Sequence, residues 1–488
     1  MRIPSILHYQ RACLWLILGL GLIFRQLFLF EPIRGDEVMA FIHFGVNPLA
    51  VILTKYTYPN NHLLYSALMH GCILLFGISP MAMRLPSLVS GVLCIWMTYR
   101  LAVALTSDSR VGLLAAFCCA SSFYLVYYSV NARGYALQTL WVVLLCDVFF
   151  RLDSRLSTFQ RRTCLAILGF FLLYTIPSGM IFLGPFLIYL AWLAHYQSPY
   201  VSWKDLRIVG ITMTVLFALA TLPIVHEFPQ IWLTNGEYGD KALPMFGEVL
   251  RRASDGLLPT SLFALFFAAA FFLVRQERRL LIFFISVLLI YPVTVIVLDH
   301  WIPQLKFFPR TYSILFPLIY ILMSSALVRV FDRPDRGSKL LAACAVVGLL
   351  FTSVRSFARV AHDPAALYYS NRQDNIILER LTFRRAKQLG PNDRFLAVKP
   401  SYDSTIAYAL SALGKVYSIR FLYKTRVRQI DLVGKSESEI NQYYREMLDK
   451  RLWTEPLKID EEPPFQVYRV MRKGLDQPLP RDIHGYME

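Results

Sequence analysis

Two adjacent carboxylates, Asp36 and Glu37, directly follow an apolar run that is long enough to cross a membrane. The stretch reads FEPIRGDEVMAF, from Phe30 to Phe41. Acids are costly near lipid and gain little as helix anchors, so a pair of them at a helix exit is more informative than a single basic residue there. A carboxylate in this position could deprotonate an attacking nucleophile.

Cations, tyrosines and amides stand at the ends of several other apolar runs. Cations can hold a phosphate leaving group, and arginine suits phosphate because its planar fork binds two oxygens. Besides the two acids, the candidates are Arg34, Lys55, Tyr58, Asn60, Asn61, His62, Arg84, Arg133, Tyr135, Lys306, Arg310 and Tyr312. Juxtamembrane Arg, Lys and Tyr also anchor helix ends, so any one of these residues alone fits that plainer role as well.

The composition indicates a membrane protein. Of the 488 residues 56% are hydrophobic and the mean hydropathy is +0.45, whereas soluble domains are roughly 45–50% apolar. A net charge of +17 would suggest nucleic acid in a soluble protein. Here the Arg and Lys residues cluster in short loops between apolar runs, as the positive-inside rule describes, so we expect no nucleic-acid partner. The eight cysteines show neither metal-ligand spacing nor a disulfide framework.

The loops also set the expected topology. If every apolar run spanned, RLDSRLSTFQRR (151–162) would lie outside and the C-terminal tail inside. If 62–78 instead lies in the membrane plane or is re-entrant, four cationic loops become cytoplasmic together, which satisfies the positive-inside rule. We therefore expect about eleven spanning helices plus membrane-parallel helices in the first outer loop. The predicted spans are 12–30, 84–105, 111–130, 134–150, 163–177, 179–195, 207–225, 259–275, 280–298, 310–330 and 339–355.

The chain then divides into a transmembrane domain, 1–361, and a soluble domain outside the membrane, 362–488. The outer loops of the first domain are 31–83, 226–258 and 299–309. In the second domain, the pattern predicts helices over 372–390 and 403–414. Strands are expected over 393–400, 416–422 and 465–471, which together describe a small α/β domain.

The ordered motifs resemble the GT-C class of integral-membrane glycosyltransferases, and within it family 39, the protein O-mannosyltransferases and the aminoarabinose transferases of lipid A. RGDEVMAF resembles their Asp-Glu motif, and NARGYALQTL their Arg-x-Tyr-Ala-Leu turn. MRLPSLVSGVLCIWMTYRLAVALT resembles their Arg-Leu-Pro-Ser helix, and KFFPRTYSILFPLIYILM their Arg-Tyr helix start. YPNNHLLYSALMH resembles the family's His-Pro-Pro-Leu-Tyr helix entry, but His62-Leu63-Leu64-Tyr65 replaces that motif, and a threonine separates Arg310 from Tyr312.

The resemblance implies an inverting transferase that takes a hexosyl or pentosyl unit from a polyprenyl- or dolichyl-phosphate donor at the outer face. It assigns the general base to Asp36, while Glu37 would bind sugar, orient the acceptor or help hold a cation. Donor phosphate would be held by Arg84, Lys306, Arg310 and Tyr312. Substrate contacts are expected from Arg34, Lys55, Tyr58, Asn61, His62, Arg133 and Tyr135. A divalent cation at Asp36 or His62 is compatible with this scheme, but the sequence shows no firm ligand set.

The acceptor stays open among lipid, glycan and protein. The expected location is the bacterial inner membrane, among membrane lipids, with the active site facing the periplasm. A polytopic lipid or solute transporter, or flippase, is the alternative from another class. It would need ionisable groups near mid-membrane and broken helices there, whereas these groups gather at the interface. A non-catalytic scaffold of the same fold is the third reading, and it predicts a silent Asp36 substitution.

Overall fold

The computed structural model describes residues 4–31, 33, 35–56, 61–151, 157–196, 201–227, 242–255, 257–301, 309–362, 372–389, 393–397, 408–410, 429–447 and 454–471. The chain forms two compact units. We call Met1–Phe30 with Asn47–His362 the helical unit, and Glu31–Val46 with Asp363–Glu488 the tail unit.

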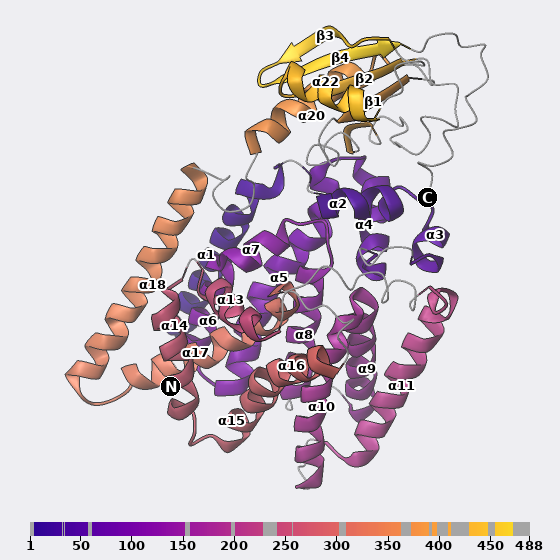
Figure 1. Ribbon diagram of the computed structural model, residues 1–488. Coiled ribbons are helices and arrows are strands. Elements are labelled where there is room, and N and C mark those ends of the chain that lie inside the picture. Colours follow the sequence, from indigo (N-terminus) through magenta and orange to yellow (C-terminus); the bar gives the residue numbers. More distant parts are fainter. Residues whose placement is uncertain are drawn as a thin grey trace. The chain divides into compact units, whose positions relative to one another are not determined.

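The helical unit consists of long apolar helices joined by short connections (Figure 1). Its α-helices are α1 (Pro4–Leu29), α3 (Leu49–Thr54), α4 (Leu63–Phe76), α5 (Pro80–Thr106), α6 (Ser109–Ser121), α7 (Phe123–Ser129), α8 (Tyr135–Phe150), α9 (Thr158–Thr175), α10 (Met180–His195), α11 (Trp203–Thr221), α13 (Ala242–Ser254), α14 (Thr260–Leu273), α15 (Arg278–Phe284), α16 (Tyr291–Trp301), α17 (Phe316–Phe331) and α18 (Arg336–His362). A π-helical segment, η4 (Ile285–Ile290), links α15 to α16, and a 3₁₀ segment, η5 (Pro309–Leu315), leads into α17.

Each of the predicted spans is helical. Among the described residues, seven helices are long and apolar enough to cross a membrane, or eight if the pair α6 and α7, bent by 64°, forms one span. α8 and α14 are apolar but shorter. The helical membrane fold is therefore confirmed, and the chain is an integral membrane protein. Seven or eight helices, rather than eleven, meet this criterion for crossing.

α4 corresponds to the apolar run 62–78, which the positions of the charged loops predicted not to cross the membrane. It has 14 residues and is therefore about 21 Å long, whereas a hydrocarbon core is roughly 30 Å thick. It packs against α3, α5 and α9. That α4 lies in the membrane plane stays a prediction.

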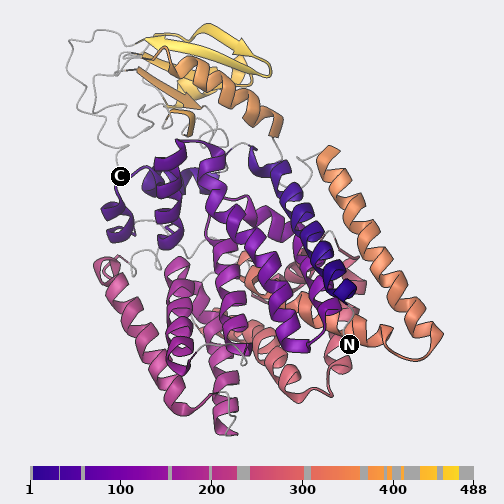
Figure 2. The same cartoon turned by 180° about the vertical axis from the view of Figure 1, so that it is seen from behind.

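The helices differ in how deeply they are buried. In the span Arg310–Phe331, which contains α17, 83% of the most apolar 18-residue stretch is buried, against 11% in Trp203–Ile224, which contains α11, and 17% in Arg336–Arg355 of α18. Figures 1 and 2 show α11 and α18 on opposite flanks of the helical unit. We infer that α17 belongs to the protein core, while α11 and α18 turn most of their apolar surface toward lipid, because water-soluble proteins rarely expose such large contiguous apolar surfaces.

Ion pairs join several helix ends at one end of the helical unit. Arg110 bonds Asp332 at 2.8 Å, and Arg329 pairs with Glu277, which links α6, α14, α15 and α17. Arg100 lies 3.2 Å from Asp147 and so joins α5 to α8. The loop after α8 leads into α9, whose Arg162 pairs with Asp205 of α11 at 2.5 Å. The connections predicted to be cytoplasmic thus share one end, which we call the cationic end.

The tail unit contains a four-stranded sheet. Its strands are β1 (Asp393–Ala397), β2 (Gln429–Gly434), β3 (Leu457–Glu462) and β4 (Phe465–Met471), in the order β1-β2-β4-β3, with only β1 and β2 parallel. α20 (Arg372–Ala386) and α22 (Glu437–Met447) accompany the sheet. The predicted helix at 372–390 and the strands at 393–400 and 465–471 are present, and 408–410 is helical. The strand predicted at 416–422 lies outside the described residues.

Sequence reasoning missed β2, β3 and α22, and it placed residues 31–46 in the membrane domain. In the structure these residues, with α2 (Gly35–Ala40) and the π-helical segment η1 (Phe41–Gly45), group with the tail unit. One reason is an edge-to-face contact at 5.8 Å between the rings of Phe41 and Tyr408.

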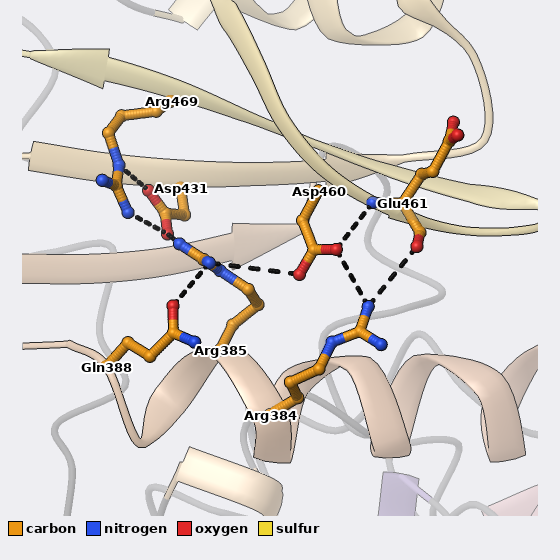
Figure 3. Close-up of polar contacts among 7 residues, drawn as sticks. All are labelled: Arg384, Arg385, Gln388, Asp431, Asp460, Glu461 and Arg469. Atoms are coloured by element: carbon orange, nitrogen blue, oxygen red, sulfur yellow. Dashed lines mark hydrogen bonds and ion pairs between the residues drawn. The ribbon is translucent and has the colours of Figure 1, made fainter.

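A buried acid in the middle of β2 explains why that strand was missed. The Asp431 side chain is fully buried and accepts hydrogen bonds from Arg385 Nη2 at 3.0 Å and from Arg469 Nε at 2.8 Å (Figure 3). Gln388 holds Arg385 from the other side at 2.6 Å. The acid thereby ties α20 and β4 to β2, whereas Asp460 makes a more exposed pair with Arg384.

We predict that Asp431→Asn destabilises the tail unit by about 3–5 kcal/mol, because it leaves two arginines without their buried counter-charge. Asp460→Asn is the matched control and should cost less than about 1 kcal/mol, since that carboxylate is partly exposed. The free energies are measured in the full chain from denaturant-dependent hydrogen exchange of the β2 and β4 amides. Equal losses in the two variants would contradict the assignment.

Candidate functional site

A basic and aromatic cluster lies at the end of the helical unit opposite the cationic end. His62 precedes α4, Arg133 precedes α8 and Arg310 lies in η5 before α17. The guanidinium carbons of Arg133 and Arg310 lie 5.4 and 5.8 Å from the centre of the Tyr135 ring. The His62 ring meets the Tyr135 ring edge-on at 5.1 Å. α8 and α17 both end at the cationic end. Their first residues, and the cluster residues beside them, therefore lie at the opposite end of the helical unit. We call these four residues the basic cluster.

The turn between α7 and α8, NARG, is tightly fixed. The Gly134 amide donates to His62 Nδ1 at 2.8 Å. A Cβ on Gly134 would lie 2.8 Å from Thr175 and 3.1 Å from His62 Nδ1, so only glycine allows this approach. From α5, the Ser87 hydroxyl bonds to the carbonyl oxygens of Asn131 and Arg133, at 2.6 and 3.0 Å. The Arg-Leu-Pro-Ser and Asn-Ala-Arg-Gly motifs thus meet each other in the fold.

His62 is neutral in this setting. Burial lowers the pKa of His62 well below its usual value of 6.5, and the charges of Arg133 and Arg310 lower it further. Since Nδ1 accepts the Gly134 hydrogen bond, the single ring proton sits on Nε2. That nitrogen lies 3.4 Å from Arg133 Nη2. The cluster therefore presents an imidazole N–H beside two guanidinium groups, which is a set of donors suited to an anion.

Tyr56 and Glu227 extend the cluster, and sequence reasoning missed both. The Tyr56 amide donates to a Glu227 carboxylate oxygen, and Lys55 lies 3.9 Å from the other oxygen. Burial raises the pKa of the Tyr56 phenol above its usual range, Tyr135 raises it further and Arg133 opposes the rise. The phenol therefore lies within electrostatic reach of the cluster. A Glu at the start of the second predicted outer loop was the only signal in the sequence.

Arg84 has a structural task that its motif did not reveal. Its side chain is fully buried, and Nη1 donates to the carbonyl oxygens of Leu29 at 2.9 Å and Phe28 at 3.4 Å. These carbonyls lack partners inside α1 because they close its last turn. Arg84 thus caps α1, and its contact with donor phosphate stays a prediction.

Arg25, one turn before the end of α1, is a buried cation that sequence reasoning passed over. Its Nη1 donates to the Gly21 carbonyl at 2.8 Å, while the buried Nε makes no hydrogen bond. Inserting an Arg at the middle of a spanning helix costs about 2.5–3.5 kcal/mol, so an Arg in such a segment usually has a function. It lines a small cavity together with Tyr128, whose ring lies 4.8 Å from that of Tyr135. Its charge adds to the positive field behind the basic cluster.

The remaining predicted residues of the helical unit are dispersed. Tyr312 is buried with its ring 5.3 Å from that of Tyr291, inside the apolar core. Asn61 donates to the carbonyl oxygens of Ile52 and Lys55 and so closes α3. Arg34, Tyr58, Asn60 and Lys306 lie outside the described residues.

Asp36 and Glu37 occupy the first turn of α2, in the tail unit. Asp36 is exposed and Glu37 is fully buried. Acids in a first turn are favoured by the helix dipole, so part of their role is local. Across the described ranges, no three His, Cys, Asp or Glu side chains form a group that could hold a metal ion. The divalent cation stays a prediction.

Known proteins share the fold of this chain. No protein-family model matches the sequence, and no curated protein does. The structure is similar to ArnT from Cupriavidus metallidurans without ligand, with 13% identity, coverage of 95% of this chain and 98% of ArnT, and a TM-score of 0.62. With ArnT bound to undecaprenyl phosphate the identity is 12%, the coverage 95% and 99%, and the TM-score 0.59.

A second similar protein is the archaeal oligosaccharyltransferase AglB from Archaeoglobus fulgidus, in complex with an inhibitory peptide and a dolichol-phosphate. The identity is 12%, the coverage is 88% of this chain and 70% of AglB, and the TM-score is 0.53. Both proteins are GT-C membrane glycosyltransferases, so the GT-C fold that the motifs predicted is confirmed.

We predict that the contact between His62 and Gly134 weakens as the pH falls below about 6.5. Above that pH both the closed and the open states hold a neutral His62, and the contact is fully present. Below it the open state takes up a proton that the closed state excludes, so stability is lost by at most about 1.4 kcal/mol per pH unit. The measurement is hydrogen exchange of the Gly134 amide, corrected for its intrinsic rate.

His62→Asn keeps an acceptor for the Gly134 amide but cannot titrate. In this variant the protection of the Gly134 amide against hydrogen exchange should be independent of pH. His70→Asn, on the same helix, should retain the wild-type profile. A pH-dependent His62→Asn variant would show that another group controls this turn.

Proposed function

We propose that this chain is a membrane glycosyltransferase that moves a sugar from a polyprenyl-phosphate-linked donor to an acceptor, with inversion at the anomeric carbon. The observation that carries the proposal is the basic cluster, which gathers anion-binding groups at one end of an apolar helical unit. A lipid phosphate needs this combination, because its chain stays in the membrane while its charge stays at the edge. The similar fold of ArnT bound to undecaprenyl phosphate supports the same chemistry.

The reaction needs a base and a partner for the leaving group. Asp36 takes the proton of the acceptor hydroxyl as its oxygen attacks the anomeric carbon. The bond from that carbon to the phosphate oxygen breaks on the opposite face, which inverts the configuration. Arg310 neutralises the departing phosphate, with Arg133 and the Nε2–H of His62 as further donors. Each kind of help is worth on the order of 10²–10⁴-fold in rate.

The remaining predicted contacts complete the proposal. Lys306, Tyr312 and Arg84 belong to the phosphate side, and Arg84 also holds the end of α1 beside it. Lys55, Asn61 and Tyr135, with Arg34 and Tyr58, belong to the substrate side. Glu37, being buried, positions α2 rather than exchanging protons. The end of the helical unit that carries the basic cluster faces the periplasm of a bacterial inner membrane, and the cationic end faces the cytoplasm. The proposed enzyme belongs to family 39 of the GT-C class. It transfers a hexosyl or pentosyl unit, and its acceptor is a lipid, a glycan or a protein.

The donor is tested by lipid mass spectrometry of a strain that lacks this chain. A polyprenyl-phosphate-linked sugar should accumulate and disappear again when the wild-type chain is restored. If no lipid-linked sugar changes in abundance, the transferase assignment fails.

We predict that Arg310→Ala lowers donor use by about 10²-fold or more, because it removes the cation that faces the leaving group. Arg310→Lys should recover part of the loss, since it restores the charge without the planar fork. Arg275→Ala, an exposed arginine at the cationic end, is the matched control. Transfer is measured in liposomes as a function of donor concentration. Normal donor kinetics in Arg310→Ala would remove this residue from the site.

For the base, we expect Asp36→Asn to lower turnover by about 10²-fold or more, with donor binding retained, because the amide cannot accept a proton. Glu37→Gln should be milder in turnover. Transfer and donor binding are measured separately in detergent or liposomes. A fully active Asp36→Asn together with an inactive Glu37→Gln would exchange the two roles, and two active variants would leave the pair as a local helix-capping feature.

A further inference from the structure

A mostly apolar cavity lies in the helical unit, away from the basic cluster. It is lined by α8, α9, α10 and α11 and is partly open to the outside, and the empty space of about 610 Å³ includes its open mouth. Its walls are apolar apart from Arg161, Arg162 and Asp205. On α8 it is lined by Leu145 and Phe149, about 15–21 Å along the helix from Tyr135. It therefore lies toward the cationic end.

The cavity is slightly shorter than the hydrocarbon part of one lipid leaflet. It extends along α9 from Arg161 to Gly169 and along α11 from Asp205 to Met213, about 12 Å in each helix. Half of a hydrocarbon core is about 15 Å. The two helices run side by side in the same direction, because Arg162 pairs with Asp205 and Met213 lies against Gly169. Gly210 leaves part of the wall open, since a Cβ there would meet no atom within 4 Å.

The charged residues lie only at the mouth. Arg162 is held by Asp205 at 2.5 Å. Arg161 is half-buried and pairs with no acid among the described residues, so its charge is available. Tyr196 directly follows α10 and Trp203 begins α11, and both are exposed, as aromatic side chains are at the membrane interface. An apolar slot with a cationic mouth at the interface matches a lipid with an anionic headgroup, because basic pockets between helices on the positive side bind such headgroups.

We propose that this cavity binds an anionic glycerophospholipid of the leaflet at the cationic end, with one acyl chain between α9 and α11 and its phosphate on Arg161. The site is separate from the proposed donor site and does not depend on the transferase assignment. Its occupant would fill the space that these four helices line and thereby hold α11, which is otherwise mostly exposed, against the rest of the unit.

Native mass spectrometry of the purified full chain tests the proposal. The probes are phosphatidylglycerol and phosphatidylcholine with matched acyl chains, offered together. The wild type should retain phosphatidylglycerol in preference to phosphatidylcholine. Arg161→Glu should reduce that preference about tenfold and Arg161→Gln by less, because each cation near the surface attracts the headgroup. Arg275→Glu makes the same charge change at the same end outside the cavity and should retain the preference.

Gly210→Leu should lower the retention of both lipids because its side chain fills the slot. Gly184→Leu on α10, where a Cβ also meets no atom within 4 Å, is its control. Thermal stability and sugar transfer show whether each variant is folded. The proposal is overturned if the wild type retains both lipids equally, or if neither Arg161→Glu nor Gly210→Leu changes retention. It is also overturned if the retained species is a polyprenyl phosphate, since the cavity would then belong to the donor.

Discussion

The hydrogen bond from the Gly134 amide to His62 Nδ1 fixes the polar end of the helical unit. It joins two loops that are 72 residues apart, the start of α4 and the start of α8. It also decides which ring nitrogen carries the proton, and so turns His62 into a donor beside Arg133. A side chain at Gly134 would push Thr175 and His62 away from this turn, and it would disturb the ring contact between His62 and Tyr135.

The two ends of the helical unit handle charge in different ways. At the cationic end, several arginines pair with acids across neighbouring helices, as Arg110 does with Asp332 and Arg162 with Asp205. At the other end, Arg84 lies on backbone carbonyls and Arg133 and Arg310 face an aromatic ring. Carbonyl dipoles and ring faces hold a guanidinium in place without cancelling its full charge. The contacts that hold the cations thus differ in kind between the two ends.

The apolar helices could be predicted from the sequence because the bilayer imposes length and hydropathy on each of them. The predictions of Arg133, Tyr135, His62 and Arg310 as site residues followed from their positions at the ends of those helices, and these four lie together in the fold. Arg25 was not predicted as a site residue. A single cation in an apolar run does not show which backbone carbonyls will surround it in the fold. β2 was missed because the acid at its centre, Asp431, is acceptable only beside Arg385 and Arg469, which come from distant parts of the chain. The same holds for α2, whose grouping with the tail depends on Tyr408.

The path of the chain has an evolutionary consequence. It leaves the helical unit after Phe30, returns at Asn47 and leaves again after His362, so the acidic motif is packed as a part of the tail although it is encoded next to the first helix. Exchanging the tail alone, by recombination or by design, would separate α2 from the partners with which it was selected. Any hybrid that borrows a new tail must also borrow residues 31–46. The two segments form one heritable module, and the acid pair and the tail should diverge together.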